Sequence, residues 1–77
     1  MGPISVKVKL FASLRTGRFE ERDMELAPGT SVRALVHALG IPGQEVTLIL
    51  VNRRHRDWDH VLAHGETCAL FPPVGGG

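Results

Sequence analysis

Apolar and polar residues alternate near the start of the chain. From Ile4 to Leu10 every second residue is aliphatic, and the residues between them are serine or lysine. A period of two predicts a strand with one face in the core and the other in water. Phe11 continues the polar phase, so its ring is expected to point outward unless the strand ends there or another segment covers it.

The next segments have weaker patterns. Residues 12–18 are mixed in character and contain a glycine, which predicts a turn or a frayed helical turn. Residues 19–26 alternate weakly and carry five charges, which suits an edge strand protected from pairing with other chains.

Helical spacing is clear in one segment. Its apolar face consists of Val32, Leu35, Val36 and Leu39. This i, i+3, i+4, i+7 pattern predicts a helix, and the hydroxyls of Thr30 and Ser31 are suited to cap its first turn. Gly40 can supply a left-handed C-terminal cap, and Pro42 prevents the helix from continuing.

The second half of the chain predicts mostly strands. Residues 47–51 form an uninterrupted apolar run, typical of a central strand that is apolar on both faces. A polar turn is expected at 52–57, at most a short strand at 58–62, a glycine-containing turn at 63–66 and a strand at 67–71. The predicted fold is α+β, with one main helix on one face of a mixed sheet of four to five strands.

Composition narrows the class of protein. The chain has 77 residues, 43% of them hydrophobic and 22% charged, which fits one ordinary small domain. The net charge of +1 and the pI of 8.0 do not indicate a nucleic-acid partner. No apolar run is long enough for a membrane span, and no signal peptide is recognisable. The single cysteine, Cys68, excludes an internal disulfide and favours a reducing compartment, so we expect the cytoplasm.

Two residue patterns resemble a metal site and an acid–base pair, but the surrounding sequence favours a structural explanation for both. His60, His64 and Cys68 are spaced by four residues, as metal ligands on a helix would be. Gly65 interrupts this segment and a strand is predicted to follow, so we expect no metal site. Asp57 and Asp59 are better explained by turn formation than by acid–base catalysis.

Residues 53–56 form a basic loop of three arginines and a histidine. A solvated turn is the favoured interpretation. Contact with an acidic partner is the main alternative, and nucleic-acid binding is disfavoured because no aromatic residues are interleaved for base stacking.

The C-terminal residues ALFPPVGGG, at 69–77, carry the most specific signal. Further matching segments are VKLFASLR at 8–15, GTSVRALVHAL at 29–39, LVN at 50–52 and WDH at 58–60. Together these segments resemble the MoaD/ThiS family of ubiquitin-like sulfur carriers, in particular the small subunits of molybdopterin synthase.

The resemblance implies a β-grasp domain over residues 1–74 and a flexible glycine tail over 75–77. It implies that the carboxylate of Gly77, preceded by Gly76, is adenylated and converted to a thiocarboxylate that donates sulfur for the dithiolene of molybdopterin. The protein would then be a co-substrate and not an enzyme. It would bind no cofactor itself, because ATP is used by the activating partner.

The implied partners are the large subunit of molybdopterin synthase, an adenylating enzyme of the ubiquitin-activating type and a sulfur donor system. No nucleic acid or membrane is implied. In a β-grasp fold the first and last strands are parallel neighbours, which would group apolar side chains on the open face of the sheet. The expected partner-binding residues are Phe11, Leu50, Phe71, Pro72, Pro73, Val74 and Gly75.

Two departures from the family pattern stand out. The tail has three glycines where two are usual, and Arg53 stands where glycine often follows the turn asparagine, so a left-handed turn there would be strained. Alternatives are the same chemistry for thiamine, tRNA thiolation or a tungsten cofactor, a ubiquitin-like binding or conjugation module, and a small metal-dependent enzyme.

Overall fold

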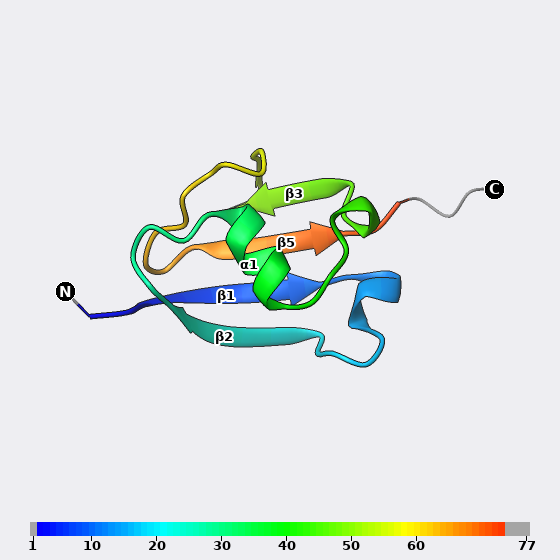
Figure 1. Ribbon diagram of the computed structural model, residues 1–77, viewed down its shortest axis with the longest axis horizontal. Helices are drawn as coiled ribbons and strands as arrows, with labels where there is room; N and C mark the ends of the chain where they lie inside the picture. Colours follow the sequence, from blue (N-terminus) through cyan, green and yellow to red (C-terminus); the bar gives the residue numbers. More distant parts are fainter. Residues whose placement is uncertain (1, 74–77) are drawn as a thin grey trace.

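The computed structural model describes residues 2–73. They form five β-strands, one α-helix and two short 3₁₀ helices, η1 and η2 (Figure 1). In chain order the elements are β1 (Ile4–Leu10), η1 (Ala12–Arg15), β2 (Glu21–Leu26), α1 (Val32–Ala38), η2 (Gly43–Glu45), β3 (Leu48–Val51), β4 (Arg54–His55) and β5 (Thr67–Phe71).

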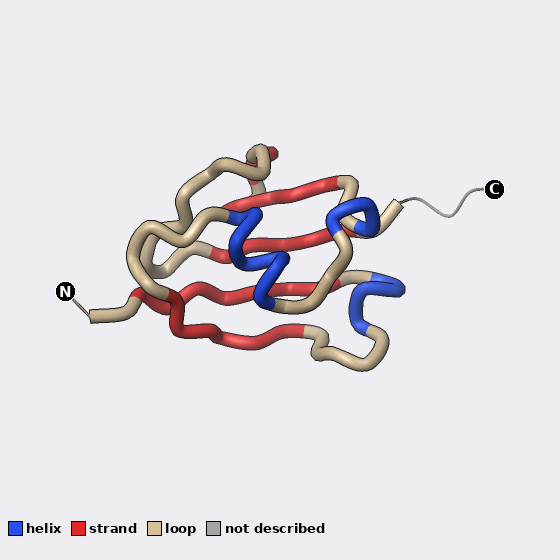
Figure 2. Tube along the Cα trace, viewed as in Figure 1, coloured by secondary structure: helices blue, strands red, loops and turns tan. Residues whose placement is uncertain are grey.

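The strands make one mixed sheet in the order β2-β1-β5-β3-β4. β1 and β5 are parallel, and the other neighbours are antiparallel. α1 lies across one face, and both 3₁₀ helices lie at the end of the sheet where β1 and β5 finish (Figure 2). This is the ubiquitin-like β-grasp arrangement, so the expected fold class and the parallel pairing of the first and last strands are confirmed.

The core lies between α1 and the sheet. β1 and β5 both bury every second side chain, as their sequence patterns predict. The core consists of Val6, Val8, Leu10, Leu14, Val32, Leu35, Val36, Ile41, Val46, Ile49, Val51, Leu62, Cys68 and Leu70. Burying one valine or leucine side chain contributes about 1.5–3 kcal/mol, so the alternation fixes which face of each strand meets the helix.

α1 begins and ends at the predicted signals. The Ser31 hydroxyl oxygen accepts a hydrogen bond from the backbone N–H of Ala34 at 3.1 Å, which caps the first turn. At the other end Gly40 has a φ of +72°, and the N–H of Ile41 donates to the carbonyl of Val36 at 3.2 Å. This is a Schellman motif, in which the buried Ile41 also closes the core.

The largest difference from the sequence prediction is β4, which lies inside the expected polar turn. Asn52 and Arg53 have φ values of +52° and +68°. Positive φ at both central residues is typical of a two-residue type I′ hairpin turn, which folds Arg54 back to pair with Val51. The left-handed turn is therefore kept although Arg53 replaces the usual glycine.

The sequence predicts at most a short strand at 58–62, and the segment forms no regular strand. Val61 makes only an isolated bridge to Ser31. β3 is an interior strand, as its apolar run predicts, because it lies between β5 and the two-residue β4. Only every second side chain of β3 is buried. β2 is an edge strand as predicted, and it starts at Glu21 because Phe19 leaves the strand and packs against the core.

None of the helices among residues 2–73 is long and apolar enough to cross a lipid bilayer.

Candidate functional site

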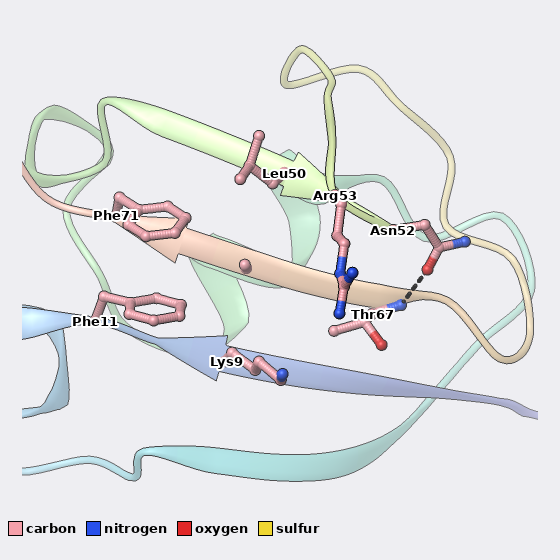
Figure 3. A pocket seen from close by; sticks show the side chains of 8 residues that line it. Lys9, Phe11, Leu50, Asn52, Arg53, Thr67 and Phe71 are labelled. Carbon is pink, nitrogen blue, oxygen red and sulfur yellow. Dashed lines mark hydrogen bonds between the residues drawn. The ribbon is translucent and has the colours of Figure 1, made fainter.

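Two aromatic rings stack on the sheet face opposite α1. Leu10 and Leu70 are partners in the parallel register of β1 and β5, so the residues that follow them, Phe11 and Phe71, lie side by side. Their ring centroids are 4.2 Å apart and their planes are 11° from parallel (Figure 3). The outward placement predicted for both rings is confirmed. An aromatic pair of this kind contributes about 0.5–1.5 kcal/mol beyond its buried area.

An open groove of about 480 Å³ extends from this aromatic stack along β5. Leu50 projects into it from β3, opposite Ala69 of β5, which is the open-face position that the family resemblance implied for Leu50. Because the side chain of Ala69 ends at Cβ, it leaves the space that forms the middle of the groove. A half-buried apolar surface of this shape is typical of a protein-binding site.

Arg15 supports the stack from η1. Its Nε donates a hydrogen bond to the carbonyl of Leu10 at 2.8 Å, and its guanidinium carbon lies 5.5 Å from the centroid of the Phe11 ring. The sequence did not indicate this role, because residues 12–18 showed no regular pattern. Arg15 therefore acts on the site by holding the ring of Phe11.

The other end of the groove is cationic. Lys9 comes from β1 and Arg53 from the β3–β4 turn, and both line the groove with Thr67 (Figure 3). Neither cation was expected on this face, although Arg53 belongs to the basic loop for which contact with an acidic partner is the alternative interpretation. The signal for Lys9 was available, because Lys9 shares the phase of Phe11 on β1. The position of Arg53 in the groove depends on the conformation of the β3–β4 turn, which hydrophobic periodicity does not predict.

The remaining predicted site residues follow β5. Pro72 is half-buried and Pro73 exposed, directly after the strand that carries Phe71. Val74, Gly75, Gly76 and Gly77 lie outside the described residues. The roles assigned to all of these positions therefore stay predictions.

The histidines and the cysteine do not come together. Cys68 is fully buried under α1, and burial raises the pKa of its thiol to about 12, with the negative charge of Glu66 as a second cause. The Nε2 of His60 lies 3.3 Å from a carboxylate oxygen of Glu66, and the Nδ1 of His64 accepts a hydrogen bond from the backbone N–H of Ser5. Among residues 2–73 no three His, Cys, Asp or Glu side chains are grouped as a metal site would require.

The two aspartates serve the turn before Val61. Asp57 Oδ1 accepts a hydrogen bond from the N–H of Asp59 at 2.9 Å, and Asp59 pairs with Arg33 at 3.1 Å. The turn interpretation of this pair is therefore confirmed. Both aspartates are exposed, and the contacts of their carboxylates are with the turn backbone and with Arg33.

The fold defines the class as a small ubiquitin-like β-grasp protein, with an open-face groove that is apolar at one end and cationic at the other. A family model described as the ThiS family matches residues 8–77. The chain belongs to the ThiS family, so the resemblance stated from the sequence is confirmed. No match was found among curated proteins.

Solved structures agree with this assignment. The putative molybdopterin converting factor, subunit 1, from Pyrococcus furiosus is 32% identical, with 92% of this chain and 99% of that chain covered and a TM-score of 0.74. SAMP1 from Haloferax volcanii is 26% identical, with coverages of 95% and 99% and a TM-score of 0.73. A chain in the complex of subunits 1 and 2 of molybdopterin-converting factor from Helicobacter pylori is 22% identical, with coverages of 96% and 100% and a TM-score of 0.64. At 22% identity, the last likeness shows the fold alone.

Proposed function

We propose that this chain is a sulfur carrier whose reacting group is the carboxylate of Gly77. In the proposed cycle, the carboxylate attacks the α-phosphorus of ATP on a ubiquitin-activating-like enzyme, pyrophosphate leaves and an acyl-adenylate forms. A sulfur donor system then delivers sulfur to the acyl carbon, and AMP leaves as a thiocarboxylate is produced. The thiocarboxylate gives its sulfur to the dithiolene of molybdopterin, and hydrolysis restores the carboxylate.

Besides family membership, the position of the aromatic stack supports this proposal. The stacked rings of Phe11 and Phe71 lie on the open face at the end of the sheet where β5 gives way to Pro72 and Pro73. A partner that rests on the aromatic stack therefore lies next to Pro72 and Pro73, the two described residues that precede the proposed reacting tail. Four extended residues reach at most about 14 Å, which is long enough to enter an active site in that partner.

The residue types after β5 suit this role. The two prolines restrict φ and so reduce the conformational entropy lost when the chain docks. Glycines have no Cβ, so they can follow a narrow channel that would exclude a side chain. In this proposal Val74 and Gly75 contact the channel, and Gly76 and Gly77 place the carboxylate at the reacting atoms of the partner.

The molybdopterin destination is supported by one relative. The Pyrococcus furiosus protein, named a putative molybdopterin converting factor subunit, is 32% identical over nearly the whole chain. We therefore propose the large subunit of molybdopterin synthase as the receiving partner, with this chain as the small subunit and co-substrate.

A second candidate is protein modification. SAMP1 from Haloferax volcanii, a small archaeal modifier protein, matches with 26% identity. In that case the activated Gly77 carbonyl would be attacked by a lysine amine of a target protein, and an isopeptide bond would form as AMP leaves. The two candidates share adenylation and differ in the nucleophile.

The proposed function is tested by reconstitution. The purified chain is incubated with ATP, the adenylating enzyme and a sulfur donor, and its intact mass is measured. The expected product has one sulfur in place of one oxygen, and it should support molybdopterin formation when the large subunit and the pterin precursor are added. Omitting ATP is the matched control.

Two results would contradict the proposal in different ways. No mass change with active enzymes would exclude the sulfur-carrier chemistry. A thiocarboxylate that reacts with no large subunit, together with higher-mass conjugates of the tagged chain, would favour the modifier function instead.

A further inference from the structure

The β3–β4 hairpin carries positive charge that the domain does not compensate. Arg53, Arg54 and Arg56 make no ion pair or side-chain hydrogen bond within residues 2–73. The other six lysines and arginines each contact an acidic side chain, a backbone carbonyl or an aromatic ring. Arginines without a local partner are available to bind an anion from another molecule.

Only Arg53 of these three arginines lines the groove on the open face. Its side chain extends from the turn over β5, toward the side where Lys9 lies (Figure 3). Arg54 is on the other face, because residues paired directly across antiparallel strands share a face and its partner Val51 is buried under α1. The two neighbouring arginines therefore present the same charge to opposite sides of the sheet.

The charge of Lys9 is already partly balanced. Its Nζ lies 3.9 Å from a carboxylate oxygen of Glu21. The uncompensated charge of the groove is thus the guanidinium of Arg53. A guanidinium binds a carboxylate through two parallel N–H···O hydrogen bonds, which makes a carboxylate beside an apolar group the best chemical complement to this groove.

The backbone of Arg53 adds an independent observation. With a φ of +68°, this position favours glycine, and any other residue is strained there. An arginine side chain at a strained position that overhangs a binding groove indicates that the side chain itself contributes to function.

We propose that Arg53 is a specificity-determining residue of the docking surface. It binds a carboxylate of the partner protein, and the partner places an adjacent apolar side chain against Leu50 and the stack of Phe11 and Phe71. This inference rests on the proposed function, because it requires that the open face docks the partner. The partner segment is therefore acidic at the β3–β4 end of the groove and apolar at the end near Pro72.

The test measures affinity for the purified large subunit of molybdopterin synthase and for the adenylating enzyme by titration calorimetry, at low and high ionic strength. Arg53→Gln should weaken binding to at least one of them by at least about fivefold at low salt, and should reduce the dependence of affinity on salt. Arg54→Gln removes the same charge from the same hairpin on the opposite face, and should change affinity by less than about twofold.

Arg53→Gly separates binding from folding. It removes the guanidinium and also the backbone strain, so its melting temperature should rise while its affinity falls as in Arg53→Gln. Wild-type affinity in either Arg53 variant, with Phe71→Ser weakened, overturns the inference and leaves the proposed function standing. Equal losses in Arg53→Gln and Arg54→Gln also overturn it. Failure of the wild-type chain to bind either enzyme overturns the proposed function and this inference together.

Discussion

Asn52 and Thr67 are joined by two hydrogen bonds, both 2.9 Å long. The backbone N–H of Asn52 donates to the carbonyl of Thr67. The Oδ1 of Asn52 accepts from the N–H of Thr67, the bond drawn in Figure 3. These bonds attach the β3–β4 turn to the start of β5. They therefore position Arg53 over the groove, although neither residue of the pair touches the aromatic stack.

Replacement of Asn52 by alanine should destabilise the domain. The variant loses the Oδ1 hydrogen bond and places alanine at a φ of +52°, a conformation that asparagine tolerates better. We expect the free energy of unfolding to fall by about 1–2 kcal/mol, measured by urea denaturation. Asn52→Asp keeps an acceptor oxygen and the turn preference, so it should lose less than half as much. Equal losses in the two variants would show that the side-chain bond contributes nothing.

Phe71→Ser should weaken partner binding without unfolding the domain. Desolvating an aromatic ring at the centre of an interface commonly contributes more than about 1 kcal/mol, so we expect affinity for the large subunit to fall at least about tenfold, or about 1.4 kcal/mol. Loss of the stack on Phe11 should lower the free energy of unfolding by about 0.5–1.5 kcal/mol, and the apolar area that the half-buried ring covers adds a further part of the roughly 1.5–3 kcal/mol of a fully buried side chain. Calorimetric titration and urea denaturation measure the two effects separately.

Leu70→Ala is the matched control in the same strand. Leu70 is fully buried, so the variant should lose about 2–5 kcal/mol of folding free energy. Severe unfolding in Phe71→Ser with normal stability in Leu70→Ala would mean that the open face is not the exposed face in solution.

Most of the fold was predictable because it depends on local periodicity. The alternation of apolar and polar residues predicted the bounds of β1, and the cap residues Ser31 and Gly40 predicted the ends of α1. The pairing of β1 with β5 required the family resemblance, since no local pattern states which strands are neighbours. That pairing is what brings Phe11 and Phe71 together.

The cationic end of the groove was predictable only in part. The phase of β1 places Lys9 on the face of Phe11, but the position of Arg53 depends on the positive φ of Asn52 and Arg53 that creates β4, and hydrophobic periodicity does not predict that conformation. The residues assigned to the chemistry itself, Gly76 and Gly77, lie outside residues 2–73.

Removal of Gly77 should abolish adenylation and leave stability unchanged. Glycine has no side chain to bury, and the core residues, which run from Val6 to Leu70, are unchanged in the deletion variant. ATP–pyrophosphate exchange with the adenylating enzyme should be lost, and an alanine added after Gly77 should have the same effect. Full-rate exchange by the shortened chain would refute the assignment. If processing exposes Gly76 instead, the intact mass of the purified protein would show it.

The buried thiol of Cys68 should make stability depend on pH in the alkaline range. Burial, assisted by the charge of Glu66, raises its pKa from 9.0 to about 12. Between these two values the unfolded chain releases the thiol proton while the folded domain keeps it. The unfolded state then binds fewer protons, so the free energy of unfolding falls as pH rises.

The slope of this decline is the measurable quantity. One group whose pKa is raised in the folded state lowers stability by at most about 1.4 kcal/mol per pH unit, and the loss ends near the folded pKa of about 12. The chain has no tyrosine, so no phenol titrates in the same window. Urea denaturation at a series of pH values from 8 to 11 should give a steeper decline for the wild type than for Cys68→Ala. The comparison uses slopes, because the alanine variant also loses packing at every pH. Parallel slopes would show that the thiol ionises equally easily in the folded and unfolded chain, and that the core around Cys68 is open to water.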